Sequence, residues 1–203
     1  MIGVTPAQRD ALKLLAGVVG PTSYLAGGVA VAARLGHRQS LDLDVFVPDG
    51  APEDLALPLS QHGADVRVLS RAAGTLYAEV LGVPVSIIRY AYALIEAAEY
   101  VADLALPLAS LEDLVCMKLA AIAGRGARRD FWDLHALLSV RGYSLDFALV
   151  LYRRKYPVED VGHVIRSLVY FADAESDPLP ANLTPEHWEQ VKSDLKHRVA
   201  SLA

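Results

Sequence analysis

The chain has 203 residues, 53% of them hydrophobic, which suits one compact domain or two closely packed lobes. Its formal net charge is −5 and its pI is about 5.6, which is unlike a protein that binds nucleic acid over its whole surface, because such domains are usually basic. The single cysteine, Cys116, excludes an internal disulfide and fits a reducing compartment.

The sequence shows no sign of export or membrane insertion. The N-terminus lacks the basic segment followed by an apolar one that marks a signal peptide. No apolar run reaches the roughly 20 residues that a helix needs to cross a bilayer. We therefore expect a cytoplasmic protein with no membrane partner.

The first half of the chain predicts short helices mixed with strands. Thr5 as N-cap and Pro6 at the first helical position start a helix that Gly20-Pro21 ends. Short apolar and β-branched runs between glycine and proline turns predict strands. The expected elements are helices over 5–20 and 29–35, a partly helical segment over 52–63 that Pro58 disturbs, and strands over 23–27, 41–47, 65–69, 75–81 and 84–90.

From about residue 108 the pattern becomes helical. Helices are expected over 111–123, 129–140, 144–155, 158–171 and 184–201, with a loop over 174–186. This succession predicts an α+β fold. A small mixed β-sheet with flanking helices would occupy residues 1–107, and a helical C-terminal lobe over 108–203 would pack on that core.

Two aspartates one residue apart interrupt an otherwise apolar strand. Residues two apart in a strand point to the same face, so Asp42 and Asp44 should project together. Leu41, Leu43 and Val45 should pack on the opposite face. Adjacent carboxylates repel each other, and a hard cation such as Mg²⁺ relieves this by binding one or two carboxylates and substrate phosphates. An edge strand with two solvated acids is the better interpretation of D-x-D alone.

A glycine pair lies between the preceding strand and the next helix. Gly27 and Gly28 would let the backbone approach a phosphate, and the helix N-terminus offers N–H groups and the positive end of the dipole. A tight turn that needs positive φ explains the glycines when they are taken alone. Together, the glycine turn and the D-x-D strand place a phosphate cradle beside a metal site, as phosphoryl and nucleotidyl transfer require.

A second group of charged residues falls on the predicted C-terminal helices. Lys118 lies on an apolar helix face, where it either snorkels or is held toward an anion. Asp130 and Asp133 share a helix face, and Asp130 lies near the helix N-terminus, where a capping or dipole role is expected. A basic group surrounds the start of this helix and consists of Arg125, Arg128 and Arg129. A solvated loop explains that group equally well.

These residues resemble the nucleotidyltransferase-fold toxins of the AbiEii and MenT type. The family's first motif is a Gly-Gly or Gly-Ser turn, about ten residues, and then R-x-S-x-D-hydrophobic-D, which Gly27-Gly28 and the run of Arg38, Ser40, Asp42 and Asp44 match. Its later motifs, a helical Lys followed by an R-D-aromatic-x-D helix, resemble residues 110–138. The two blocks cover about 50 of the 203 residues, in the family's order and spacing.

The resemblance implies a Mg²⁺-dependent nucleotidyltransferase, with Mn²⁺ as the alternative ion, that moves a nucleoside monophosphate from an NTP to an acceptor hydroxyl. It implies that Asp42 and Asp44 bind the metal, that Gly27, Gly28, Arg38 and Ser40 hold the triphosphate, that Lys118 neutralises phosphate charge, and that Asp133 is the general base, with Asp130 and Arg129 as further candidates. It also implies the toxin of a toxin–antitoxin pair, with a tRNA as acceptor and a cognate antitoxin as partner.

One position departs from the wider superfamily, in which many members supply a third carboxylate from a later core strand. The matching strand here offers Ser86, with Glu79 on the neighbouring strand as a substitute. In the toxin families the third acid is thought to come from the helical block, which implies Asp133. Two other functions stay open: nucleotidylation of a protein acceptor, which the acidic pI favours, and a non-catalytic nucleotide- or partner-binding module with the same fold.

Two local basic groups are candidates for contacting RNA. The first consists of Arg125, Arg128 and Arg129, and the second of Arg153, Arg154 and Lys155, which a tyrosine flanks on either side. The first lies next to the proposed catalytic residues, so it is the better candidate for guiding an acceptor strand. The exposed end of a helix explains the second equally well.

Overall fold

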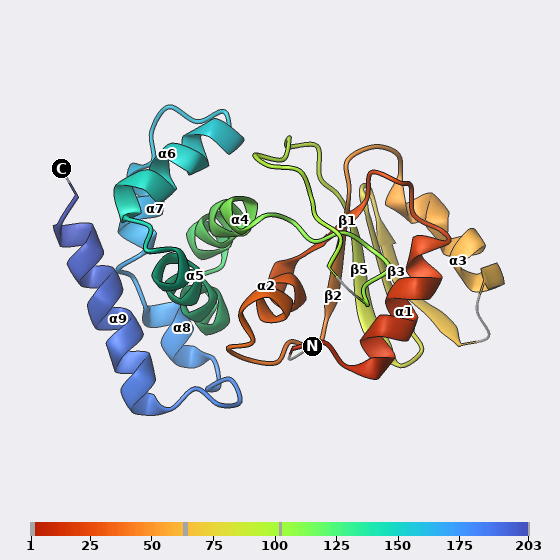
Figure 1. The fold of residues 1–203 in the computed structure, drawn as a ribbon, viewed down its shortest axis with the longest axis horizontal. Helices are drawn as coiled ribbons and strands as arrows, with labels where there is room; N and C mark the ends of the chain where they lie inside the picture. The colour runs from red at the N-terminus through yellow and green to blue at the C-terminus, as the bar shows by residue number, and fades with distance from the viewer. Residues whose placement is uncertain (1–2, 63–64, 102, 203) are drawn as a thin grey trace. The chain divides into compact units, whose positions relative to one another are not determined.

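The computed structural model describes residues 3–62, 65–101 and 103–202 (Figure 1). The chain divides into two compact units, Met1–Ser110 and Leu111–Ala203. The first combines a β-sheet with helices and the second is helical, which confirms the predicted α+β class.

The N-terminal unit is built on a five-stranded sheet in the order β1-β2-β5-β4-β3. Its strands are β1 (Tyr24–Ala26), β2 (Leu43–Val47), β3 (Val66–Ala72), β4 (Thr75–Val80) and β5 (Val83–Arg89). β2 and β5 pair in parallel, whereas the other neighbours pair antiparallel, so the sheet is mixed as predicted. The parallel pair requires a long crossover, which here carries two short helical segments and the β3–β4 hairpin.

Four helical segments accompany this sheet: α1 (Pro6–Ala16), α2 (Gly27–Leu35), the 3₁₀ helix η1 (Pro52–Leu55) and α3 (Ala56–His62). α1 starts at the predicted cap, where the Thr5 side chain accepts a hydrogen bond from the Gln8 backbone and completes a capping box. Figure 1 shows α1 and α3 on one side of the sheet and α2 on the other. α2 begins at Gly27, two residues earlier than predicted, so the glycine pair is itself the first turn of the helix.

The predicted packing of the aspartate strand is wrong at its start. Leu41 is 72% exposed, and Leu41 and Asp42 both precede β2. The pairing of β2 with its neighbours begins at Leu43 on one side and at Asp44 on the other, so residues 41 and 42 have no ladder partner in these pairings. Leu43 and Val45 are buried as predicted, whereas Asp44 and Ser86 are half-buried on the opposite face.

The segment after β5 returns to the outer edge of the sheet, which the sequence did not predict. The Leu25 N–H donates to the Pro107 carbonyl at 2.8 Å, and the Ala109 N–H donates to the Leu25 carbonyl at 3.0 Å. Arg34 from α2 holds the same segment, because its Nε donates to the Ala109 carbonyl at 2.9 Å. Backbone near residue 108 therefore covers the edge strand β1.

The C-terminal unit contains α4 (Leu111–Gly124), α5 (Arg128–Arg141), α6 (Leu145–Lys155), α7 (Gly162–Ser167), α8 (Ala172–Ser176) and α9 (Pro185–Ala200). Four helices match their predicted ranges to within about one residue. The predicted helix over 158–171 is wrong, because only Gly162–Ser167 is helical there. The Asp160 side chain accepts the Gly162 N–H at 2.7 Å, a local turn that competes with helix formation before residue 162. The predicted loop over 174–186 is also wrong at its start, where α8 lies.

The second basic group does not present three free cations. Arg153 and Arg154 are exposed, but Lys155 is buried and its Nζ donates to Asp113 Oδ1 at 2.6 Å. Both side chains have 0% exposure, so the pair joins α6 to α4 inside the unit. Burial, followed by the nearby Asp113 charge, raises the pKa of the adjacent Cys116 thiol to about 12, which keeps that thiol protonated and inert.

Replacing Lys155 with alanine should destabilise the protein by about 3–5 kcal/mol, because it removes the cation that is paired with the buried Asp113 carboxylate. Urea unfolding of the variant measures this loss. The double variant Lys155→Met with Asp113→Leu is the control, since replacing both charges by apolar groups is often neutral. A single variant as stable as the double variant would contradict the buried pair.

Among the residues that the structure describes, no single helix is both long and apolar enough to cross a membrane. α5 and α6 reach that length and composition together, but they are bent by 110° at their junction. Both helices carry buried charged side chains, including Asp130, Asp133 and Lys155.

Candidate functional site

The glycine turn lies directly against Asp44. Gly27 has a φ of +63°, and a Cβ on it would lie 2.0 Å from Asp44 Oδ2. A Cβ on Gly28 would lie 2.5 Å from Ser40 Oγ and 2.7 Å from Arg38 Nη2. The turn therefore needs glycine for its backbone conformation and also for close approach to three polar side chains. The structure brings five of the predicted site residues together at this point.

The N-terminus of α2 adds positive potential beside this carboxylate. Ala26 at the N-cap provides no side-chain cap hydrogen bond, so the first N–H groups of the helix are not capped by their neighbouring side chain. The positive end of the helix dipole and the Arg38 guanidinium both lie at the glycine turn. A cation and an anion can thus both be accommodated here, the first by Asp44 and the second by the helix end and Arg38.

The loop that carries Arg38 and Ser40 is held from α1 by Gln8, a residue for which the sequence predicted no role in the site. Gln8 is buried, and its Nε2 donates to the carbonyls of Ser40 at 2.8 Å and Leu41 at 3.1 Å. Its Oε1 accepts the Thr5 N–H at 2.9 Å. The T-x-x-Q pattern predicts the capping box. The contact of Gln8 with Ser40 and Leu41 spans more than 30 residues, so no local pattern in the sequence predicts it.

Asp42 is exposed and lies one residue before β2, whereas Asp44 lies within the strand and is half-buried. Ser86 is the register partner of Asp44 on β5, which is where a third strand acid would stand. Glu79 lies in a different row and pairs with Arg67 at 2.8 Å. In the described part of the chain, no group of three or more His, Cys, Asp or Glu could hold a metal ion. A two-carboxylate donor set still fits Mg²⁺, which keeps its waters and completes its shell with substrate phosphates.

The predicted helical residues form a second, buried cluster within the C-terminal unit. Lys118 Nζ lies 2.9 Å from Asp130 Oδ1 and 2.7 Å from Asp133 Oδ2. Asp130 and Asp133 are fully buried and Lys118 nearly so. The spacing thus placed both aspartates on one helix face correctly, and α4 supplies the lysine between them. Lys118 is held by two carboxylates, so the snorkelling alternative is wrong.

Asp130 forms ion pairs with two cations in addition to its place near the start of α5. Arg125 Nε and Nη2 donate to its carboxylate at 2.8 and 3.0 Å, in addition to the Lys118 contact. Burial acts to raise the pKa of Asp130, but the Lys118 and Arg125 charges and hydrogen bonds outweigh burial and lower it below its usual value. The carboxylate therefore stays ionised. The ion pairs with Lys118 and Arg125 explain the position of Asp130 in the helix better than an interaction with the helix dipole does.

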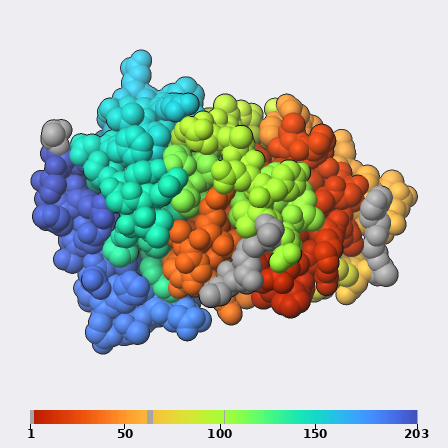
Figure 2. All heavy atoms as spheres, in the orientation of Figure 1, coloured from red at the N-terminus to blue at the C-terminus, as the bar shows by residue number. Residues whose placement is uncertain are grey.

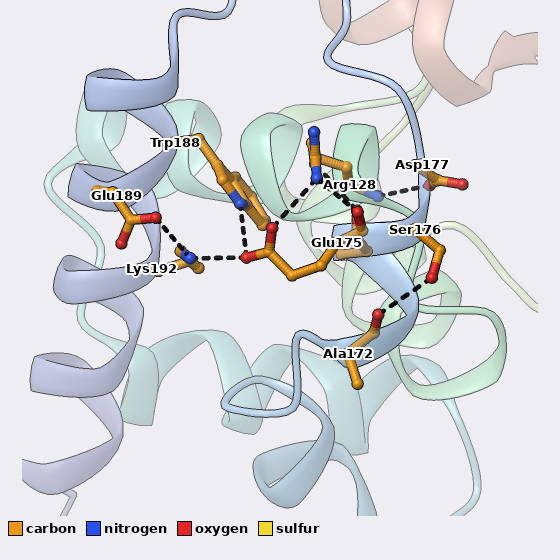
Figure 3. A network of polar contacts seen from close by, with 9 residues as sticks. Arg128, Ala172, Glu175, Ser176, Asp177, Trp188, Glu189 and Lys192 are labelled. Atoms are coloured by element: carbon orange, nitrogen blue, oxygen red, sulfur yellow. Dashed lines mark hydrogen bonds and ion pairs between the residues drawn. The ribbon is translucent and has the colours of Figure 1, made fainter.

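Arg128 was predicted to contact RNA, but its side chain instead links α5 to α8 and α9 within the C-terminal unit (Figure 3). Its side chain is 7% exposed, its Nε donates to the Ala174 carbonyl at 2.9 Å, and its Nη2 lies 3.2 Å from Glu175 Oε2. Its guanidinium also lies over the Trp188 ring at 5.3 Å. Glu175 further accepts hydrogen bonds from Trp188 and Lys192. The sequence could not reveal this role, because the partners lie more than 40 residues away in α8 and α9.

Arg128→Ala should lower the free energy of unfolding by about 2–3 kcal/mol, because it removes a buried cation with several hydrogen bonds. Arg129→Ala, its exposed neighbour, should change stability by less than about 0.5 kcal/mol. Thermal unfolding of the two variants side by side tests the assignment. Equal effects would show that Arg128 is not a structural tie, and the same pair of variants separates lost RNA contacts from lost folding.

Gly27→Ala should abolish nucleotide binding, because the added methyl group would displace the Asp44 carboxylate. Gly142 is the matched control, since it has the same φ of +63° but nothing within 4 Å of its Cβ position. Both alanine variants should lose roughly 1–2 kcal/mol of stability to backbone strain. Calorimetry with NTP should detect binding to Gly142→Ala only. Normal binding to Gly27→Ala would show that this close approach is not needed.

The mixed sheet carries a glycine turn pressed against a strand carboxylate, and a Lys–Asp–Asp cluster follows on the later helices. This order of features is the one expected of a nucleotidyltransferase. Residues 76–201 match the family described as "Nucleotidyl transferase AbiEii toxin, Type IV TA system". An uncharacterised protein of Aquifex aeolicus is 35% identical over 196 residues, which cover 95% of this chain and 94% of that protein. The chain belongs to the AbiEii nucleotidyltransferase toxin family, which confirms the resemblance and the enzyme class.

Solved structures share the fold. MenT4, a nucleotidyltransferase toxin from Mycobacterium tuberculosis, is 19% identical with a TM-score of 0.62 over 97% of this chain and 82% of its own. JHP933 from Helicobacter pylori is 19% identical with a TM-score of 0.57 over 97% and 90%. The antibiotic-resistance factor ANT(2'')-Ia is 18% identical with a TM-score of 0.53 over 74% and 92%. These likenesses confirm the predicted nucleotidyltransferase-like fold.

Proposed function

We propose that this enzyme is a Mg²⁺-dependent toxin that transfers a nucleoside monophosphate from an NTP to a hydroxyl group of a tRNA. In the reaction the acceptor oxygen bonds to the α-phosphorus, the bond to pyrophosphate breaks, and the hydroxyl proton passes to a base. The observation that carries the proposal is the contact of the Gly27–Gly28 turn with Asp44, Ser40 and Arg38.

The N-terminal unit supplies the groups for the triphosphate. The α2 N-terminus and Arg38 would bind phosphate oxygens, and Ser40 would donate to them. Asp42 and Asp44 would hold Mg²⁺, or Mn²⁺ in its place. When bound, the ion supplies neutralisation of the charge that develops on the phosphate oxygens. Gln8 fixes the loop and so limits the freedom of Arg38 and Ser40 before the substrate arrives.

The C-terminal unit would supply a cation and a base. Two carboxylates hold Lys118, so its ammonium is fixed in position without any substrate. Lys118 would neutralise phosphate charge, and Asp133 would accept the proton of the acceptor hydroxyl. Asp130 would orient the lysine, and Arg125 would hold the Asp130 carboxylate in place.

The biological role rests on the family. Its description names a toxin of a type IV toxin–antitoxin system, and MenT4 carries the same designation of nucleotidyltransferase toxin. By this relation the chain would act in the cytoplasm and be neutralised by a cognate antitoxin protein. A tRNA offers a terminal hydroxyl as acceptor, and exposed Arg129 would contact its backbone.

The experiment uses each α-labelled NTP in turn with purified protein, total RNA and cell extract, with Mg²⁺ or with EDTA. Label in small RNA that depends on Mg²⁺ would support the proposal. Label in protein would show that the acceptor is a protein and not a tRNA. No label with any NTP would favour a non-catalytic binding module. Asp44→Asn protein serves as the control for contaminating transferases.

A further inference from the structure

A strip of aromatic rings follows Asp44 on the same face of the sheet. Phe46 is two residues beyond Asp44 in β2, so both side chains point to one face, about 6.6 Å apart along the strand. The Phe46 and Tyr90 rings stack at 4.6 Å with 12° between their planes, and the Tyr92 ring meets Tyr90 edge-on at 5.2 Å. These three residues are called the aromatic strip.

The strip reaches the protein surface. Tyr92 is 47% exposed and Phe46 and Tyr90 are partly exposed, whereas Tyr24, which meets Phe46 edge-on from the neighbouring strand, is buried. The Tyr90 N–H donates to the Val47 carbonyl at 2.9 Å, which ties the strip to the end of β2. Figure 2 shows the segment that follows β5, in yellow-green, on the surface of the molecule.

The register places the strip opposite the glycine turn. In the β1–β2 pairing, Ala26 faces Asp44 and Tyr24 faces Phe46, and Gly27 follows Ala26. Asp44 therefore lies between the glycine turn on one side and the aromatic strip on the other. In phosphoryl transfer the attacking and leaving oxygens lie roughly in line across the phosphorus. If the glycine turn binds the pyrophosphate that leaves, the strip lies on the side from which the acceptor attacks.

We propose that the aromatic strip is a stacking surface for unpaired bases of a single-stranded RNA acceptor, in which the Phe46–Tyr90 stack supports the exposed ring of Tyr92 and Tyr92 meets the base. The inference rests on the proposed function, because it needs the triphosphate at the glycine turn. Aromatic rings bind the faces of bases of any sequence, so they give an acidic protein affinity for RNA that a general positive field cannot supply. The bases of a paired duplex are stacked on each other and do not offer their faces.

The test compares Tyr92→Ala with Tyr92→Phe, which keeps the ring, and with Tyr100→Ala, a change at a tyrosine of the same segment that is 73% exposed. Fluorescence anisotropy measures binding of a short single-stranded RNA and of the same strand in a duplex. Calorimetry measures NTP binding. Tyr92→Ala should bind the single strand about 5- to 150-fold more weakly, whereas Tyr92→Phe and Tyr100→Ala should match the wild type. NTP affinity should be unchanged in all three.

Two results would overturn the stacking surface. Equal RNA affinity of Tyr92→Ala and Tyr100→Ala would show that Tyr92 binds no base, and lost NTP affinity in Tyr92→Ala would assign the ring to the nucleotide. Failure of the proposed function looks different, because the wild type would then transfer no label to RNA from any NTP, whichever way Tyr92→Ala changes RNA binding. Label on protein with no RNA binding would overturn the stacking surface while leaving nucleotidyl transfer intact.

Discussion

Asp44→Asn should lower nucleotidyl transfer by about 10³-fold or more. The substitution keeps the shape of the side chain but removes the negative charge beside the glycine turn and Arg38. A metal ion contributes several kcal/mol of charge stabilisation to such a reaction, and under the proposed function Asp44 would be one of its ligands. The fold should persist, because Asp44 is only half-buried and its strand keeps both neighbours.

Calorimetry with NTP, in the presence and absence of Mg²⁺, separates this effect from misfolding. Wild-type protein should show Mg²⁺-dependent binding, and Asp44→Asn and Asp42→Asn should show much less. Asp49→Asn is the matched control, since this exposed aspartate lies just after the same strand. If both Asp44→Asn and Asp42→Asn bound NTP as tightly as the wild type and with the same dependence on Mg²⁺, the proposed metal site would be wrong.

Asp133→Asn should lower transfer by about 10²- to 10⁴-fold, which is the usual contribution of a general base. The folded state should survive, because Lys118 keeps its contact with Asp130 at 2.9 Å when the Asp133 charge is removed. NTP affinity should stay near the wild-type value. Single-turnover transfer at saturating NTP, measured together with the free energy of unfolding, checks both halves of this expectation.

Asp130→Asn is the paired control and should mainly destabilise the protein. Since the pKa of Asp130 is lowered in the folded state, its carboxylate contributes stability at neutral pH that is lost as the pH falls through that lowered pKa. The difference in stability between wild type and Asp130→Asn should therefore be full at pH 7 and vanish in acid. If Asp130→Asn is stable and inactive while Asp133→Asn is active, the two roles are reversed.

Local patterns predicted most of the fold, because capping residues, turns and hydrophobic spacing act over a few residues. Thr5 and Pro6 gave the start of α1, and the spacing of Asp130 and Asp133 gave their shared face. The failures involve contacts between distant segments. Arg128 looked like a free cation because Glu175 and Trp188 are remote in sequence, and Lys155 looked exposed because Asp113 lies 42 residues earlier.

In the candidate site too, local patterns were predicted correctly, whereas contacts between distant segments were not. The glycine turn, Arg38, Ser40 and Asp44 were recognisable from a motif within 18 residues, and the structure brings them together. The burial of Leu41 was not predicted correctly, because the start of β2 depends on where β1 and β5 offer partners. Gln8 and the aromatic strip were missed because their importance arises only when α1, β2 and the segment after β5 lie together.

The backbone cover on β1 bears on when the enzyme becomes active during its own synthesis. The glycine turn and Asp44 are translated early, but β1 bonds to Pro107 and Ala109, and Arg34 reaches the same segment. At about 5–20 residues per second, the 65 residues from position 44 to 109 take roughly 3–13 s to translate. Until then β1 is an open edge that a second chain could pair with. A nascent or truncated chain that ends before residue 107 leaves the β1 edge uncovered. We expect such a chain to be inactive as a transferase and prone to aggregate.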